Sequence, residues 1–147
     1  MHDTSYDLAV IGGGPAGSSA ARRAAQLGLW VLLLEKRAMP RMKPCGGALS
    51  EAALRQLGFE LPPALINSQI RGACVHYRRH ASSARVERRI AVLVSRENFD
   101  ALLLEMARQA GAVCETATAR NLTRQNERVL ITTGERVFAA SAVIIAQ

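Results

Sequence analysis

Hydrophobic positions in the first 35 residues form two short runs with an alanine-rich stretch between them. Residues 6–11 (YDLAVI) are rich in strand formers, and residues 18–27 are typical of a helix. Residues 29–34 (LWVLLL) show no polar alternation, which is typical of a parallel strand buried on both faces. Because Gly28 is placed to end the helix, the pattern predicts one complete strand–helix–strand unit by Glu35.

The rest of the chain divides into a loop, two helices and further strands. The prolines and glycines of residues 36–47 predict a long loop, after which Ser50 is placed to cap a short helix that Gly58 stops. Ser95 is placed to cap a second helix over residues 96–110. Strands are expected at residues 70–79, 85–94, 112–116, 119–123, 129–133 and 141–146.

The fold class that follows is α/β, a Rossmann-like βαβ fold with additional antiparallel strands. The strands at 70–79 and 85–94 are expected to pair with one another and to leave one face solvated, as an insertion at about residues 70–94. We expect residues 1–147 to form a single dinucleotide-binding domain.

Composition supports one ordinary globular domain. The chain has 147 residues, of which 49% are hydrophobic and 21% charged, so intrinsic disorder is excluded. No apolar run approaches the roughly 20 residues of a membrane helix, and residues 1–6 do not resemble a signal peptide. We therefore expect a cytosolic protein.

The net charge of +7 is concentrated in the middle of the chain. Residues 36–96 hold twelve Lys or Arg against three Glu, but they contain no helix-turn-helix pattern and no continuous basic run. With only 4% aromatic residues, the chain offers no stacking platform for bases. We expect no nucleic-acid partner, and we attribute much of the arginine excess to the solvated face of the inserted strands.

The three cysteines, Cys45, Cys74 and Cys114, are far apart and outside any C-x-x-C spacing. Neither a disulfide framework nor a metal site is predicted, since the histidines also lack ligand spacing. Cys74 and Cys114 fall within apolar strands, where we expect core positions.

The chemistry-bearing motif is the run GGGPAG at residues 12–17, which follows a predicted strand and opens a predicted helix. In such a fingerprint Gly12 allows the tight turn, Gly14 lets the backbone approach a pyrophosphate, and Gly17 lets helix and strand pack closely. Glu35 stands 23 residues after Gly12, where a carboxylate can bind an adenosine ribose. The alternative is a purely structural turn.

The stretch 6–35 resembles the FAD-binding start of the flavoprotein superfamily that includes the aromatic-ring hydroxylases and the geranylgeranyl reductases. Residues 43–47 (KPCGG) look like the reductases' own signature, and residues 94–100 (VSRENFD) are similar to the family's V-x-R-x-x-F-D segment. The final strand resembles the one that leads into the family's second flavin-contacting motif. The resemblance covers about the first third of a family member, so we expect an incomplete fold without the substrate-binding domain.

The resemblance implies FAD as the cofactor and a set of residues that contact it. Arg96 lies in a first helical turn, where the helix dipole repels a cation unless an anion such as the FAD pyrophosphate lies nearby. The alternative is a surface ion pair with Asp100. Cys45 would line the active site as a catalytic thiol, or else be a small buried hydrophobe. Arg41 would neutralise phosphate or reduced flavin, or else be solvated. The implied cofactor-binding residues are Gly12, Gly14, Pro15, Ala16, Gly17, Glu35, Lys36, Arg41, Cys45, Gly46 and Arg96.

The function implied is the FAD-binding portion of an oxidoreductase that reduces C=C bonds of a prenyl chain. The implied partners are a prenyl-type or other small-molecule substrate and an electron donor, either NAD(P)H or a ferredoxin-like protein. Peripheral membrane contact through a lipid substrate stays open. Two alternatives also stay open: an FAD-dependent monooxygenase of the hydroxylase branch, and a truncated nucleotide-binding module without turnover.

Overall fold

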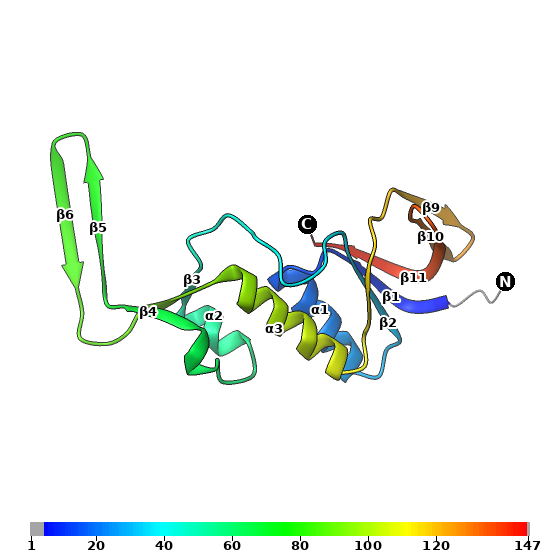
Figure 1. The fold of residues 1–147 in the computed structure, drawn as a ribbon, viewed down its shortest axis with the longest axis horizontal. Helices are drawn as coiled ribbons and strands as arrows, with labels where there is room; N and C mark the ends of the chain where they lie inside the picture. The colour runs from blue at the N-terminus through cyan, green and yellow to red at the C-terminus, as the bar shows by residue number, and fades with distance from the viewer. Residues whose placement is uncertain (1–4, 147) are drawn as a thin grey trace. The chain divides into compact units, whose positions relative to one another are not determined.

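The computed structural model describes residues 5–146, and the chain forms two compact units (Figure 1). The first unit comprises the residues up to Arg41 together with those from Asp100 onward, and the second comprises Met42–Phe99. The second unit is thus inserted between the two halves of the first.

A six-stranded sheet forms the frame of the first unit, in the order β8-β2-β1-β11-β10-β9. The strands β8, β2, β1 and β11 run parallel, and β10 and β9 continue the sheet in antiparallel fashion. Their bounds are Ser5–Ile11 (β1), Val31–Glu35 (β2), Val113–Thr116 (β8), Asn121–Gln125 (β9), Arg128–Thr132 (β10) and Val137–Ile145 (β11). Every residue of β2 is buried, as its uninterrupted apolar run predicts.

Two helices cover one face of this sheet, α1 (Pro15–Gln26) and α3 (Arg96–Gln109). Ala21 of α1 and Ala107 of α3 are fully buried, and they share a hydrophobic cluster with Val10 and Leu33 of the central strands. The small alanines let the helix backbones lie close to the sheet. This confirms the predicted α/β class and the Rossmann-like βαβ unit.

The opposite face of the sheet is covered by its own antiparallel strands. Ile131 and Phe138 join Leu32 and Leu34 in a second cluster. Strand β2 begins at Val31, two residues later than predicted, and Leu29 and Trp30 are exposed. The Asp7 carboxylate accepts a hydrogen bond from the Trp30 N–H at 2.7 Å, which takes that residue out of the strand.

The second unit contains a three-stranded sheet in the order β3-β7-β4 and a separate two-stranded hairpin, β5–β6. The strands span Ala48–Ser50 (β3), Ile66–Ile70 (β4), Gly72–Tyr77 (β5), His80–Arg85 (β6) and Ala91–Val94 (β7); a helix, α2, spans Glu51–Gln56, and a 3₁₀ turn spans Pro63–Leu65. The predicted cap is confirmed, since the Ser50 hydroxyl accepts a hydrogen bond from Ala53 N–H at 3.1 Å.

The predicted pairing of residues 70–79 with 85–94 is wrong. Strand β5 pairs instead with β6 through a tight turn, with Tyr77 opposite His80, while β7 pairs with β3 and β4. The turn is made by Arg78 in the left-handed region, at φ 54°. Because arginine is not a turn-forming residue, the sequence carries no signal for this reversal.

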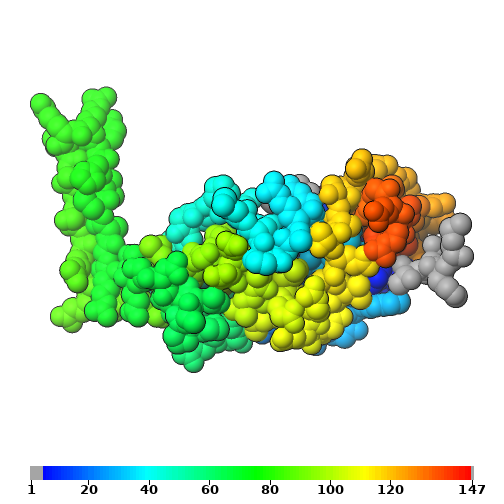
Figure 2. All heavy atoms as spheres, in the orientation of Figure 1, coloured from blue at the N-terminus to red at the C-terminus, as the bar shows by residue number. Residues whose placement is uncertain are grey.

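The β5–β6 hairpin is solvated on both faces, whereas the prediction had one face buried. Val75 and Tyr77 are each 66% exposed, and in Figure 2 no atoms of its own unit cover its strands in this view. Cys74 is exposed as well, so its predicted core position is wrong; its sulfur lies 3.2 Å from His76 Nε2. Cys114 is half-buried, and burial raises the pKa of its thiol.

Within residues 5–146, no helix is both long enough and apolar enough to span a bilayer.

Gly47 fixes the start of the three-stranded sheet. Its backbone has φ +66°, and its carbonyl accepts a hydrogen bond from Val94 N–H at 3.0 Å. A Cβ at this position would lie 2.0 Å from the Val94 carbonyl oxygen. Gly58 has a similar φ of +69°, but within residues 5–146 a Cβ there would have no atom within 4 Å apart from its neighbours in the chain.

We therefore expect Gly47→Ala to destabilise the second unit more than Gly58→Ala. Both replacements cost about 1–2 kcal/mol for a left-handed alanine, and Gly47→Ala adds about 1–3 kcal/mol because strand β7 must move. Urea denaturation of the two variants measures the difference. Equal losses of unfolding free energy would contradict the close approach at Gly47.

Candidate functional site

The glycine-rich loop joins the end of β1 to the start of α1. Gly12 has φ +112°, and its N–H donates to the Leu34 carbonyl at 2.8 Å. A Cβ on Gly17 would lie 1.8 Å from the Gly12 carbonyl oxygen, so only glycine allows α1 to begin this close to the strand. This is the packing that the fingerprint spacing predicts for Gly17.

Gly13 makes the contact that holds the loop against β2. Its N–H donates to Glu35 Oε2 at 2.7 Å, and a Cβ on Gly13 would lie 2.9 Å from the Glu35 Cβ. Ser18, fully buried in α1, donates from its hydroxyl to the Gly13 carbonyl at 3.1 Å. Sequence reasoning assigned no role to Gly13 or Ser18, because the fingerprint leaves both positions unspecified.

Gly14 is the N-cap of α1, and its backbone is extended, with φ −75° and ψ −177°. In the described part of the chain no side-chain hydrogen bond caps the helix here, Pro15 occupies the first turn, and that turn holds no acidic residue. Among the residues 5–146, and apart from the neighbours of Gly14 in the chain, the only atom within 4 Å of a Cβ on Gly14 is Arg41 Nη2, at an ordinary 3.7 Å. Neither backbone conformation nor neighbouring atoms therefore require glycine at this position.

Arg41 lies between two carboxylates. Its Nε is 3.4 Å from Glu35 Oε1 and its Nη2 is 3.4 Å from Asp100 Oδ2. The Arg41 side chain is 10% exposed, so the alternative of a solvated loop residue is wrong. Asp100 is fully buried, so the alternative role for it as a surface ion-pair partner is wrong too.

The Glu35 carboxylate is thus surrounded by donors from three places: the Gly13 N–H, the Arg37 N–H at 3.1 Å, and the Arg41 guanidinium. Burying a carboxylate costs free energy unless it is hydrogen-bonded or paired, and here it is both. Lys36, which follows directly, is exposed. The first unit therefore gathers the predicted residues Gly12, Gly14, Gly17, Glu35 and Arg41 at one end of its parallel strands.

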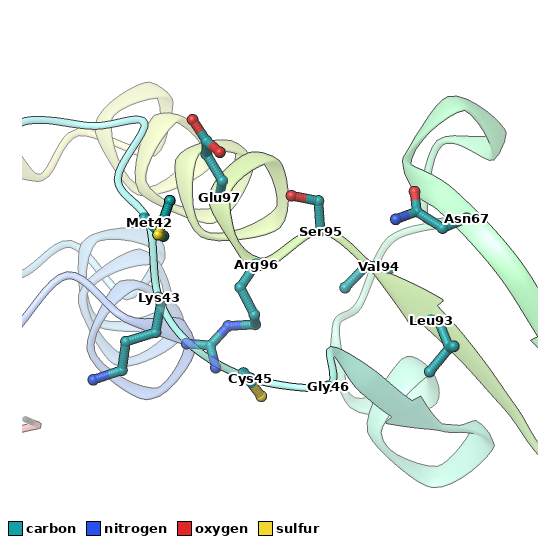
Figure 3. A pocket seen from close by; sticks show the side chains of 10 residues that line it. All are labelled: Met42, Lys43, Cys45, Gly46, Asn67, Leu93, Val94, Ser95, Arg96 and Glu97. Carbon is teal, nitrogen blue, oxygen red and sulfur yellow. The ribbon is translucent and has the colours of Figure 1, made fainter.

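Pro15, Ala16 and Lys36 also belong to the first unit. The three other predicted residues, Cys45, Gly46 and Arg96, lie in the second unit, around a pocket of about 340 Å³ (Figure 3). Cys45 and Gly46 come from the loop, and Arg96 comes from the start of α3. The exposed Cys45 accepts a hydrogen bond through its sulfur from Gly47 N–H at 3.4 Å, so it is not a buried hydrophobe. The pocket is lined by Met42, Lys43, Cys45, Gly46, Asn67, Leu93, Val94, Ser95, Arg96 and Glu97.

Two cationic side chains, Lys43 and Arg96, lie on this pocket with one carboxylate, that of Glu97. In Figure 3 the Arg96 guanidinium points toward the Cys45 segment, whereas the Glu97 carboxylate points away from it. A Cβ on Gly46 would meet no atom of the described residues within 4 Å, apart from its neighbours in the chain. The pocket is therefore suited to an anionic or polar ligand group.

Curated relatives resemble most of the chain. It is 35% identical to a geranylgeranyl diphosphate reductase of Rhodobacter capsulatus, over 95% of this chain and 36% of the relative. It is 32% identical to a digeranylgeranylglycerophospholipid reductase of Thermoplasma acidophilum, over 84% of this chain and 33% of the relative. The chain thus spans about a third of the length of these two proteins.

Among solved structures, the fold is similar to that of a geranylgeranyl bacteriochlorophyll reductase-like protein of Thermoplasma acidophilum. The TM-score is 0.85 at 29% identity, covering 97% of this chain and 39% of the other. The flavin-dependent brominase Bmp2 shares the fold at 24% identity and a TM-score of 0.80, over 98% of this chain and 38% of the other. The family model described as FAD dependent oxidoreductase matches residues 7–146, and the chain therefore belongs to that family.

Proposed function

We propose that this chain binds FAD as part of an oxidoreductase that reduces C=C bonds of a prenyl chain. One observation carries the proposal: the N-terminus of α1 has no side-chain cap and adjoins the buried Glu35 carboxylate. A helix N-terminus binds phosphate, and a carboxylate at the end of the second strand binds a ribose hydroxyl. The two halves of an ADP group thus have matching partners in the first unit.

The surroundings of Gly14 leave room for the pyrophosphate of FAD. A glycine that neither the backbone nor a neighbouring side chain requires leaves space above the first turn of α1. That space is what a pyrophosphate needs in order to reach the N–H groups of the turn. Glu35 also fits, because each carboxylate oxygen accepts about two hydrogen bonds and Oε2 receives one from Gly13.

The prenyl substrate is inferred from the relatives, whose names describe reductases of geranylgeranyl groups. When bound, reduced FAD supplies the hydride, and the chain's own residues bind and orient the cofactor. The flavin contacts of Cys45, Gly46, Lys36 and Arg96, the electron donor, and membrane contact through a lipid substrate stay predictions from the resemblance.

A direct test is titration of the purified protein with FAD, followed by the quenching of flavin fluorescence. We expect saturable binding with one FAD per chain. Reduction of a C=C bond is tested separately, with dithionite as the reductant, in a protein of the relatives' length, because this chain spans about a third of that length. A product two mass units heavier per reduced bond is expected there. A protein that binds NADH but not FAD would contradict the proposal.

Glu35→Gln should weaken FAD binding about tenfold to hundredfold, because the ribose loses a charge-assisted hydrogen bond worth about 1.5–3 kcal/mol. Fluorescence titration measures the affinity. The matched control is Glu105→Gln, which removes an exposed carboxylate that pairs with Arg108 on the surface of α3. Unchanged FAD affinity in Glu35→Gln would contradict the proposal that Glu35 binds the ribose.

Gly14→Ala and Gly17→Ala should separate binding from folding. Gly14→Ala is expected to keep most of the unfolding free energy, because its Cβ meets no close neighbour, yet to lose FAD affinity by tenfold or more. Gly17→Ala should destabilise the fold by several kcal/mol, since its Cβ collides with a backbone carbonyl. Thermal unfolding and FAD titration of both variants give the comparison. A Gly14→Ala variant with full affinity would contradict the phosphate position.

A further inference from the structure

Asp100 is a fully buried carboxylate outside the fingerprint and away from Glu35 in the sequence. An ionised carboxylate is buried at large cost unless a cation and hydrogen bonds compensate it. One cation is provided by Arg41, whose Nη2 lies 3.4 Å from Asp100 Oδ2. The sequence places Asp100 at the end of the VSRENFD segment, and the one role considered for it there was that of a surface partner of Arg96.

The same guanidinium reaches the Glu35 carboxylate with its Nε, also at 3.4 Å. Only arginine offers donors in a rigid planar fork that can meet two carboxylates at once. Arg41 Nη2 is also the atom nearest to the position of a Cβ on Gly14, at 3.7 Å. One side chain thus connects the first part of α3, the end of β2 and the N-cap of α1.

We propose that Asp100 is a positioning residue for the FAD site: it holds the Arg41 guanidinium, and Arg41 in turn orients the Glu35 carboxylate beside the α1 N-terminus. The inference rests on the proposed function. The buried carboxylates of Glu35 and Asp100 share the Arg41 guanidinium. Removal of one carboxylate therefore changes how the guanidinium is held against the other. Asp100 acts on FAD only through Arg41.

The first experiment compares FAD and ADP affinities of the wild-type protein and Asp100→Asn. Asparagine keeps the size of the side chain but loses the negative charge that holds Arg41. Both affinities should fall by the same factor, about tenfold to hundredfold, because ADP carries the part of FAD that Glu35 and the α1 N-terminus bind. Glu105→Gln, on the exposed side of α3, should retain wild-type affinity.

A double-mutant cycle with Arg41→Gln separates positioning from a merely structural role. If Asp100 acts through Arg41, adding Asp100→Asn to Arg41→Gln causes no further loss of affinity. The proposal would be overturned if the double variant lost FAD affinity by the product of the two single-variant factors. Wild-type affinity in Asp100→Asn alone would overturn it too. Absence of FAD and ADP binding by the wild-type protein would instead overturn the proposed function.

If Asp100→Asn does not fold, Arg41→Lys addresses the same question. Lysine keeps the positive charge but cannot span two carboxylates with a planar fork. The proposal requires a loss of FAD affinity similar to that of Arg41→Gln, in a protein whose circular dichroism is that of the wild type. Full affinity in Arg41→Lys would show that charge alone is sufficient, and it would overturn the bridge.

Discussion

The buried carboxylate of Glu35 imposes a constraint that the organisation of the first unit satisfies. A negative charge at the end of a strand buried along its whole length must be compensated locally. The compensation comes from the backbone of the glycine loop, the backbone just beyond β2, and the Arg41 side chain. The Glu35 carboxylate thus links the glycine loop, the end of β2 and the segment that contains Arg41.

This constraint explains which glycines are structural. Gly13 and Gly17 have no room for a side chain, the first because of Glu35 itself and the second because α1 starts against the loop. Gly14 has room, and its identity is better explained by a ligand than by the fold. The sequence fingerprint gives the positions of these glycines. The structure then distinguishes Gly13 and Gly17, which the packing of the loop requires, from Gly14, which it does not require.

Much of the first unit could be predicted because its signals are local. An unbroken apolar run, an alanine-rich helix and a helix-ending glycine each depend on adjacent residues. The ion pair between Asp100 and Arg41 could not be predicted, since it joins two side chains far apart in the chain. The i, i+4 spacing in the sequence suggests Arg96 as the partner of Asp100 instead.

The second unit was predicted less well, for a related reason. Its strands are short, and the reversal between β5 and β6 depends on an arginine in a backbone conformation that arginine rarely adopts. Alternating hydrophobic residues from Val86 to Val94 suggested one long strand, whereas only β7 is regular there. Because β5 and β6 bury neither face, hydrophobic periodicity carries no information about their register.

The position of β11 makes the first sheet depend on residues far apart in the chain. This strand lies between β1 and β10, and its parallel pairing with β1 joins Leu8 to Ala142 and Ile11 to Ile145. The centre of the first sheet therefore needs residues 5–11 and residues 139–145 together, while all strand pairs of the second unit lie within residues 48–94. The second unit can therefore complete its local strand pairs before the first sheet can complete its centre.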